Sequence, residues 1–374
     1  MGTRSQGLPT STNAGSEQRC ALDTFRWARF RLVYRAVQPL LLPPYKGSTF
    51  RGPFGGIFHD LVCTRSEYSH CNLCPLHTVC PYAIVFEPSP PEDARMMQRF
   101  SDIPRPFVIE PELSQKTTYQ PGETFTFDFL VFGKAIQLFP YFVLTFRDFG
   151  EKGIGKGRGR VVLERVDFLG REGKSVVYQE GENLVHTQWK AETGEDLLQG
   201  ETASAFSTHI QESSELTLEF QTITRLTQES QVVSKPEFPV LIRTLARRFS
   251  ALLAFYHDTP LEIDYPALFA QAETVHLVKN ETHWQEWERY SRRQQKKMEM
   301  GGLVGCATYQ AQDPDGFSPF IPFLLLGTVA HVGKGAVFGL GKMNIHEGVV
   351  FTCTQSDWAS SARIELAARV PLVT

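Results

Sequence analysis

Four cysteines form the densest group of metal-ligating side chains in the sequence. Cys63, Cys71, Cys74 and Cys80 lie within 18 residues. Four thiolates close a tetrahedral zinc site, and the Cys71–Cys74 pair has a usual spacing for one. Because the flanking spacings differ from those of a standard zinc finger, an iron–sulfur cluster is the alternative. Four cysteines leave no open position for a catalytic water, so we expect a structural metal that stabilises a short insertion.

Two glycine-rich basic segments, residues 153–160 (GIGKGRGR) and 333–342 (GKGAVFGLGK), have a composition suited to binding phosphate. Glycine permits positive φ and close approach of the backbone to a phosphate chain, while Lys and Arg neutralise its charge. A Walker loop would need Ser or Thr after the lysine and a helix to follow, and this chain has Met343 before an expected strand. A flexible hairpin is the alternative for either segment.

The apolar patterns predict an α+β protein in which one order of elements occurs twice. In the first half we expect strands at 24–37, 83–86, 107–110, 123–131 and 161–168, with helices from Ser48 or Thr49 to Cys63 and at 136–149. A ferredoxin-like domain has the order strand, helix, strand, strand, helix and strand, and these elements follow it with one additional short strand between the helices.

The second half repeats this order less clearly. We expect strands at 215–224, 302–310 and 343–346, with helices at 238–257 and 321–331. In both halves a glycine-rich segment follows the last helix and precedes the last strand. The sequence therefore predicts a polar, disordered tail at 1–20, a ferredoxin-like domain at 21–213 with the Cys-rich insertion at 63–80, a second ferredoxin-like domain at 214–347, and an extension at 348–374.

The overall charge gives no general attraction to nucleic acid. The net charge is −3 and the sequence pI is about 6.4. Binding to RNA would therefore need local basic patches. One such patch, Arg289–Lys297, follows Trp284 and Trp287, whose rings suit base stacking; a solvated hairpin tip is the alternative. The sequence has no run of 18 apolar residues, so we expect no membrane span. Its seven cysteines, four of them crowded between Cys63 and Cys80, are unlike a secreted disulfide framework, so we expect a cytoplasmic protein.

Three segments resemble one family. GSTFRGPFGGIFHDL before the cysteines, FRDFGEKGIGKGRGR and GKGAVFGLGK are similar to segments of the RAMP-superfamily endoribonucleases that process CRISPR precursor RNA, the sixth Cas family. The resemblance extends from about Thr24 to His346, and the Cys-rich insertion indicates a subgroup. It implies two ferredoxin-like (RRM-like) domains that bind CRISPR repeat RNA and cleave it, with other Cas effector subunits as further partners.

The resemblance also implies catalytic residues. Cleavage without a catalytic metal proceeds by attack of the 2′-OH on the adjacent phosphate, giving a 2′,3′-cyclic phosphate. The family places a catalytic His on the first helix, which here is His59, with Tyr45 in the preceding loop. Arg65 stands where the family has Lys, and an Arg cannot easily act as the acid. His331 and His346 are competing candidates, and His59 is alternatively a structural residue beside the cysteines.

The predicted function is thus a metal-independent endoribonuclease that processes precursor CRISPR RNA. The alternatives are a non-catalytic RAMP subunit that binds guide RNA in an effector complex, and a metal-stapled adaptor protein that binds no RNA. The predicted RNA-binding residues are Lys46, Arg51, Lys156, Arg158, Arg160, Arg292, Arg293, Lys334, Gly335, Gly339, Gly341 and Lys342.

Overall fold

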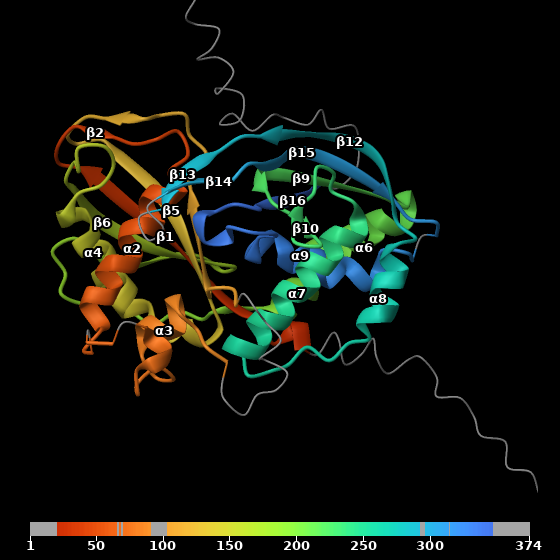
Figure 1. Cartoon of the computed structure of the whole chain (residues 1–374), viewed down its shortest axis with the longest axis horizontal. Coiled ribbons are helices and arrows are strands. Elements are labelled where there is room, and N and C mark those ends of the chain that lie inside the picture. Colours follow the sequence, from red (N-terminus) through yellow and green to blue (C-terminus); the bar gives the residue numbers. More distant parts are fainter. Residues whose placement is uncertain are drawn as a thin grey trace, which may run out of the picture.

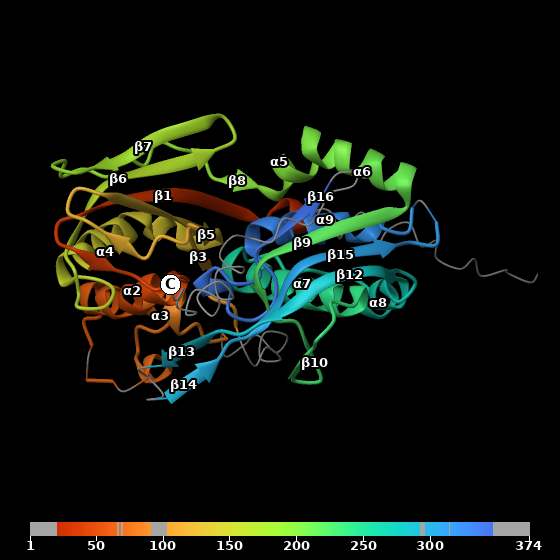
Figure 2. The same cartoon turned by 90° about the horizontal axis from the view of Figure 1, so that it is seen from above.

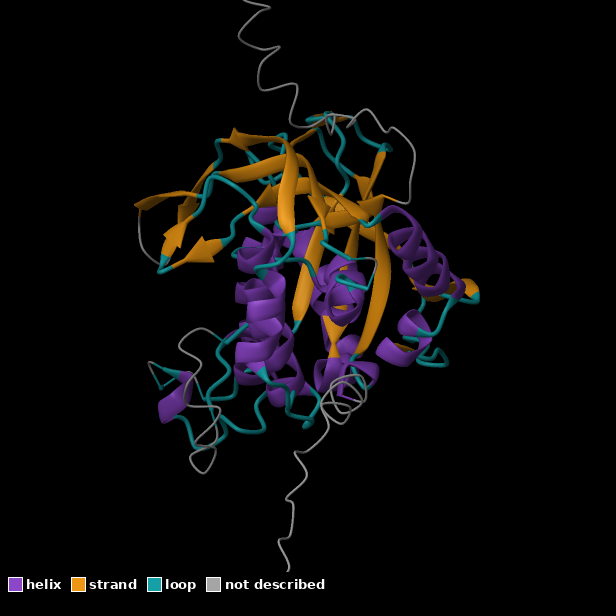
Figure 3. Cartoon of the chain, turned by 90° about the vertical axis from the view of Figure 1, so that its right-hand side faces the viewer, coloured by secondary structure: helices purple, strands orange, loops and turns teal. Residues whose placement is uncertain are grey.

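The computed structural model describes residues 21–346 except 66, 69, 91–102, 292–295 and 314. The predicted tail 1–20, the extension 348–374, Arg292 and Arg293 therefore lie outside the described residues. The described chain has two main antiparallel sheets side by side, one from each half of the sequence (Figure 1). Helices gather on one side of the strands (Figure 3). The predicted α+β class is confirmed.

The first sheet has the strand order β3-β5-β1-β6-β7, with the short β8 paired to β1. Helices α2 and α4 follow β1 and β5, so the order β1, α2, β3, β5, α4, β6 agrees with the predicted succession. The bounds are β1 Arg26–Ala36, α2 Gly47–Val62, β3 Phe107–Pro111, β5 Thr124–Phe132, α4 Phe139–Lys152, β6 Val161–Gly170, β7 Gly173–Gln179 and β8 Glu192–Thr193.

Two local predictions in this half are wrong. The expected strand 83–86 is part of helix α3, Pro81–Phe86, because Pro81 at the first helical position has the φ that a helix needs. A short apolar run does not by itself distinguish strand from helix. Helix α2 begins at Gly47, after Lys46, without a side-chain cap, so Ser48 and Thr49 lie inside the helix.

An aromatic layer fills the space between the first sheet and its helices. Phe125, Phe127 and Phe129 alternate along β5 and are buried. Phe50 of α2 stacks on Phe127 with ring centroids 4.5 Å apart, and further phenylalanines of α2 and α4 pack in the same way. The many phenylalanines of this half thus build its core.

The second sheet has the order β12-β15-β9-β16, with α7 between β9 and β12 and α9 between β15 and β16. The bounds are β9 Glu215–Thr224, α7 Phe238–Tyr256, β12 His276–Gln285, β15 Gly302–Gln310, α9 Ile321–Ala330 and β16 Met343–His346. The predicted strands of this half are present, but β12 was missed. It is a mostly exposed edge strand of polar residues and therefore lacks the alternating pattern that identifies a half-buried strand.

Two helices and one hairpin of the structure were not among the expected strands and helices. Helices α6, Glu201–Ser213, and α8, Tyr265–Ala272, flank β9 and α7 in the sequence. Strands β13, Glu288–Ser291, and β14, Lys296–Glu299, form a hairpin between β12 and β15. This hairpin, called the arm below, reaches toward the first half (Figure 1, Figure 2).

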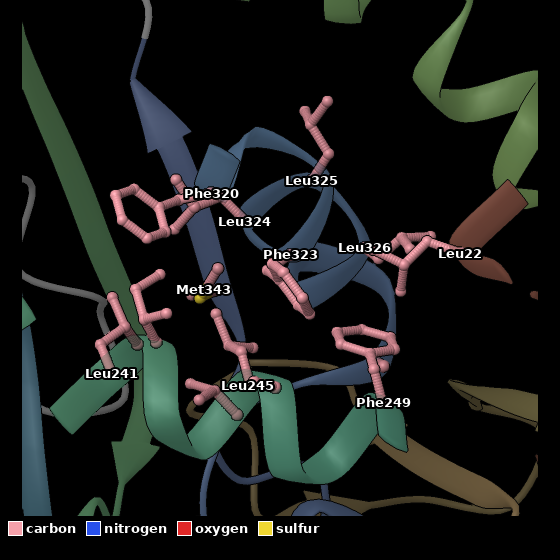
Figure 4. Packing of buried hydrophobic residues seen from close by; sticks show 14 of the residues in the cluster. Leu22, Leu241, Leu245, Phe249, Phe320, Phe323, Leu324, Leu325, Leu326 and Met343 are labelled. Atoms are coloured by element: carbon pink, nitrogen blue, oxygen red, sulfur yellow. The ribbon is translucent and has the colours of Figure 1, made fainter. Parts of the chain in front are cut away.

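The two halves share a hydrophobic core. Leu22 and Phe25, which precede β1, belong to the same buried cluster as α7 and α9. Leu22 lies beside Leu326 and Phe249 (Figure 4). The Arg26 amide donates to the His257 ring over 2.8 Å. Among the described residues, the longest apolar helices fall short of what crossing a membrane requires.

Two glycines of positive φ allow a matched test of this packing. A Cβ added to Gly339 (φ +80°) would lie 2.6 Å from the Ile109 carbonyl oxygen, whereas one added to Gly122 (φ +92°) would meet nothing within 4 Å. We expect Gly122→Ala to lower the free energy of unfolding by about 1–2 kcal/mol. Gly339→Ala should lower it by a further ~1–3 kcal/mol from overpacking. Urea unfolding measures both, and equal losses would contradict the close contact.

Candidate nucleic-acid interface

The glycine-rich loop 333–342 packs against the first half of the chain. Its central 3-10 turn, η5 (Ala336–Phe338), contacts α2 and β3. The Tyr45 hydroxyl donates to the Phe338 carbonyl over 2.7 Å. The loop therefore lies at the boundary between the two halves, and η5 faces the beginning of α2.

Two glycines of this loop have structural partners. The Gly339 amide donates to Ala336 over 2.8 Å and the Gly341 amide donates to Ile223 over 2.9 Å. Both residues are buried. Their N–H groups are therefore not available to phosphate, which corrects the predicted role of these two glycines. Gly335 (φ +90°) is half-buried and Lys334 is exposed, so both remain candidates for contact with RNA.

A buried carboxylate connects the ends of this loop to the first sheet. Glu110 of β3 accepts from His331 Nε2 and from Lys342 Nζ, each over 2.9 Å, and its nearest contact with Arg29 is 3.2 Å. The Glu110 side chain is only 4% exposed. Burial opposes its ionisation, but the hydrogen bond from His331 and the charges of Arg29 and Lys342 hold the pKa of Glu110 well below its usual value.

This network changes the interpretation of two predicted residues. Lys342, predicted to bind RNA, has its ammonium group engaged by Glu110. His331, a competing catalytic candidate, is fully buried between Glu110 and the Leu340 carbonyl. Sequence reasoning missed Glu110, although a carboxylate in the wholly buried strand FVIEP is the kind of residue that requires a partner.

Tyr45 and Lys46 lie before the first turn of α2 and are both buried. Burial raises the pKa of Tyr45 well above its usual value, so its hydroxyl is a neutral donor. Lys46 Nζ donates to the Ser114 carbonyl over 2.8 Å, and burial lowers its pKa. The prediction that Lys46 contacts RNA is therefore wrong, because its side chain is enclosed and holds the loop before α2.

His59 lies near the other end of α2. The helix rises about 1.5 Å per residue, so His59 is roughly 18 Å along the axis from Gly47, which follows Tyr45 and Lys46 directly. The structure therefore does not bring Tyr45 to His59. The His59 side chain is 38% exposed, with Nδ1 3.8 Å from Asp60 and its ring 4.7 Å from that of Tyr82.

His59 and Arg65 line the same pocket as the four cysteines. The guanidinium of Arg65 is exposed and pairs with Glu67 at 3.2 Å. Burial raises the pKa of Cys71 to about 11, and the neighbouring Glu87 and the other three thiols act in the same direction. In the described part of the chain, no three His, Cys, Asp or Glu side chains form a ready metal-ligating group. The structure thus gathers the four thiols around one pocket without a closed ligand geometry.

The first glycine-rich loop lies elsewhere on the molecule. It packs on residues 39–42, where the Lys156 amide donates to the Leu41 carbonyl over 2.9 Å. The side chains of Lys156, Arg158 and Arg160 are exposed, so they remain candidate phosphate contacts. The two loops follow α4 and α9, respectively, but contact different segments.

Two arginines meet at the second loop. The guanidinium of Arg51, from α2, lies 5.7 Å from the centre of the Phe338 ring, and that of Arg289, from the arm, lies 4.6 Å from it. Arg51 was predicted from the sequence. Arg289 was predicted only as part of the basic patch Arg289–Lys297. Nothing in the sequence indicates that it lies against a loop about fifty residues further along the chain.

Two protein-family models match this chain, one in each half of the sequence. Residues 218–343 match the family model of CRISPR-associated endoribonuclease Cas6. Residues 25–190 match a family model described as an N-terminal domain. An uncharacterized protein of Archaeoglobus fulgidus is 24% identical over 305 residues, covering 81% of this chain and 92% of the relative.

Two solved structures are similar to this chain. A partial Cas6-RT-Cas1–Cas2 complex is 12% identical with a TM-score of 0.53, and the match covers 95% of this chain but only 55% of that one. A Thermus thermophilus Cas6 is 13% identical with a TM-score of 0.45, covering 86% of this chain and 99% of that one.

The Glu110 network predicts a large and pH-dependent loss on neutralisation. We expect Glu110→Gln to lower the free energy of unfolding by about 3–5 kcal/mol at pH 7, because Arg29 and Lys342 then lose their buried counter-charge. The folded-state pKa is depressed, so this stabilisation is present above the unfolded pKa of about 4.3 and is lost as pH falls through the folded value. Urea unfolding at several pH values measures it.

The control is Glu123→Gln, which breaks an exposed pair with Lys116. It should leave stability unchanged, because exposed ion pairs contribute little. If Glu110→Gln were equally harmless, or if its effect did not shrink in acid, the network would not stabilise the junction of the two halves.

Proposed function

We propose that this chain is a Cas6-like endoribonuclease that binds CRISPR repeat RNA and cleaves precursor transcripts into guide RNAs. The cleavage we propose needs no catalytic metal. A 2′-oxygen attacks the adjacent phosphorus, the 5′-oxygen leaves with a proton, and the product ends in a 2′,3′-cyclic phosphate. The match of residues 218–343 to the endoribonuclease family model is the observation that carries this proposal.

We assign both halves as ferredoxin-like domains. In the first sheet β3 lies at one edge next to β5, and β1 lies between β5 and β6. In the second sheet β12 lies at one edge next to β15, and β9 lies between β15 and β16. One helix follows the first strand and another follows the third. This recurrence supports the tandem arrangement that the family resemblance implies.

His59 is the proposed catalytic residue. An imidazole can accept and return a proton near neutral pH, which the transfer from the 2′-OH requires. The side chain is partly exposed, and no hydrogen bond within the described part of the chain fixes its ring in the core. Arg65, in the same pocket, can supply positive charge to the phosphorane but is poorly suited as the acid.

A second candidate function has its own supporting observation. His59 lines the cysteine pocket, and Tyr45 is held at the opposite end of α2. This arrangement favours a non-catalytic subunit that binds guide RNA with the same fold. Other Cas effector subunits as partners and a cytoplasmic location also remain predictions.

Cleavage of the locus's own repeat RNA in EDTA separates the two functions. We expect the wild type to cut the RNA, and His59→Ala to cut at least ~100-fold more slowly with RNA affinity within about threefold. His186→Ala is the control, since His186 is also exposed and pairs with a neighbouring carboxylate, Glu182. Undiminished cleavage by His59→Ala would remove that residue from the mechanism. Binding without cleavage by the wild type would favour the second function, and no binding would overturn both.

We also propose that Cys63, Cys71, Cys74 and Cys80 hold a structural zinc ion. All four are free cysteines that line one pocket, which fits a thiolate-bound cation. An iron–sulfur cluster on the same thiolates is the alternative.

Metal analysis of the purified chain tests this assignment. We expect one zinc per chain by mass spectrometry, its loss in Cys74→Ser with a lower Tm, and its retention in His77→Ala. His77 lines the same pocket, and its Nδ1 already contacts the Cys74 carbonyl, so it serves as the matched control. Iron with a visible chromophore would instead assign the cluster, and a metal-free wild type with an unchanged Tm in chelator would refute a structural metal.

A further inference from the structure

Arg51 and Arg289 lie against one aromatic ring at the junction of the two halves. Arg51 comes from α2 and stacks on both Phe86 and Phe338, at 5.1 Å and 5.7 Å from the ring centres. Arg289 comes from β13 of the arm and lies 4.6 Å from the centre of Phe338. One cation from each half of the chain thus converges on the tip of the glycine-rich loop.

Neither guanidinium has a carboxylate partner among the described residues. The Nε atoms of both Arg51 and Arg289 are buried without a hydrogen-bond acceptor there. The one hydrogen bond of Arg289 within the described chain is a contact of 3.4 Å to the sulfur of Met298. By contrast, Arg31 of β1 has two hydrogen bonds to Asp128, at 2.7 Å and 2.9 Å.

The two positive charges repel one another in a site that is partly shielded from solvent. Burial lowers the pKa of Arg51 to about 10, and the charges of Arg105 and Arg289 act in the same direction. Buried donors without acceptors are costly, and buried charge is normally paired. Two arginines without a counter-charge make the electrostatic potential at this site favourable for binding an anion.

We propose that Arg51 and Arg289 together bind one phosphodiester group of the RNA, at the tip of the glycine-rich loop. The planar guanidinium matches a phosphate through two parallel hydrogen bonds, and both guanidinium groups lie against the Phe338 ring. Because the arginines come from α2 and the arm, the bound phosphate connects the two halves. The identity of the ligand as RNA rests on the proposed function, whereas the anion site rests on the arginines alone.

The RNA test replaces each guanidinium with an apolar chain that still covers Phe338. We expect Arg51→Met and Arg289→Met each to weaken binding of the repeat RNA by about tenfold. The double variant should lose less than the product of the two effects, because both side chains act on the same phosphate. Its plot of log affinity against log salt should become shallower by about 0.7, the value for one phosphate contact with a single strand.

The matched control is Arg243→Met. Arg243 also lies over a phenylalanine, Phe269 at 5.4 Å, but it is paired with Glu273 at 2.7 Å. Its replacement should leave the affinity and the salt dependence unchanged. Unchanged affinity in the Arg51 and Arg289 variants would overturn the shared site. A fully additive loss in the double variant, with a change of slope that corresponds to two phosphate contacts, would overturn it as well.

A second measurement does not depend on RNA. Sulfate should raise the Tm of the wild type by mass action and should do so less in either variant. In anion-free buffer the variants should be at least as stable as the wild type, because they remove an uncompensated charge. Variants that are less stable there and respond normally to sulfate would show a merely structural role and overturn the proposal. Arginine-dependent stabilisation by sulfate in a protein that binds no RNA would keep the anion site and refute the proposed function.

Discussion

The buried Glu110 carboxylate determines how the two halves meet. It lies on β3, the edge strand of the first sheet, and binds His331 and Lys342, which bracket the glycine-rich loop 333–342. A charge in this position is stable only while its partners stay in place. The ends of the loop are therefore fixed against the first half, and Phe338 at its tip accepts a hydrogen bond from Tyr45 and lies against two arginines.

The same constraint explains why the loop is rich in glycine. Gly339 and Gly341 have positive φ and lie against backbone from β3 and from the residue after His331, where a side chain would collide. The Gly339 amide donates to Ala336 within the loop, and the Gly341 amide donates to Ile223 of β9. A composition of glycine and lysine is thus compatible with a phosphate cradle and with a tightly packed support, and only the contacts decide between them. Here the contacts of Gly339 and Gly341 are those of a packed support, whereas Lys334 and Gly335 stay accessible.

The sequence predicts the local elements well because their patterns are local. Strands β9 and β15 and helix α9 follow directly from periodicity and turn residues. The edge strand β12 was missed because its polar residues do not alternate with apolar ones, and the helix α3 was predicted as a strand because its apolar run is too short to show a helical period. The site is harder to predict. Glu110 and His331 are 221 residues apart, and the burial of Lys46 depends on Ser114. Residue types suggest candidates, but partners across the chain determine which remain available.

The Cys-rich insertion is connected to the proposed chemistry through one short helix. Helix α3 begins directly after Cys80. Its Tyr82 contacts the ring of His59, and its Phe86 packs on Phe54 and under Arg51. A six-residue helix has little stability alone, so its position depends on the packing around it and on the restraint at its first residue. A metal held by the four thiols would supply that restraint. With such a metal bound, the insertion would orient the imidazole of His59 at one end of α3 and the guanidinium of Arg51 at the other.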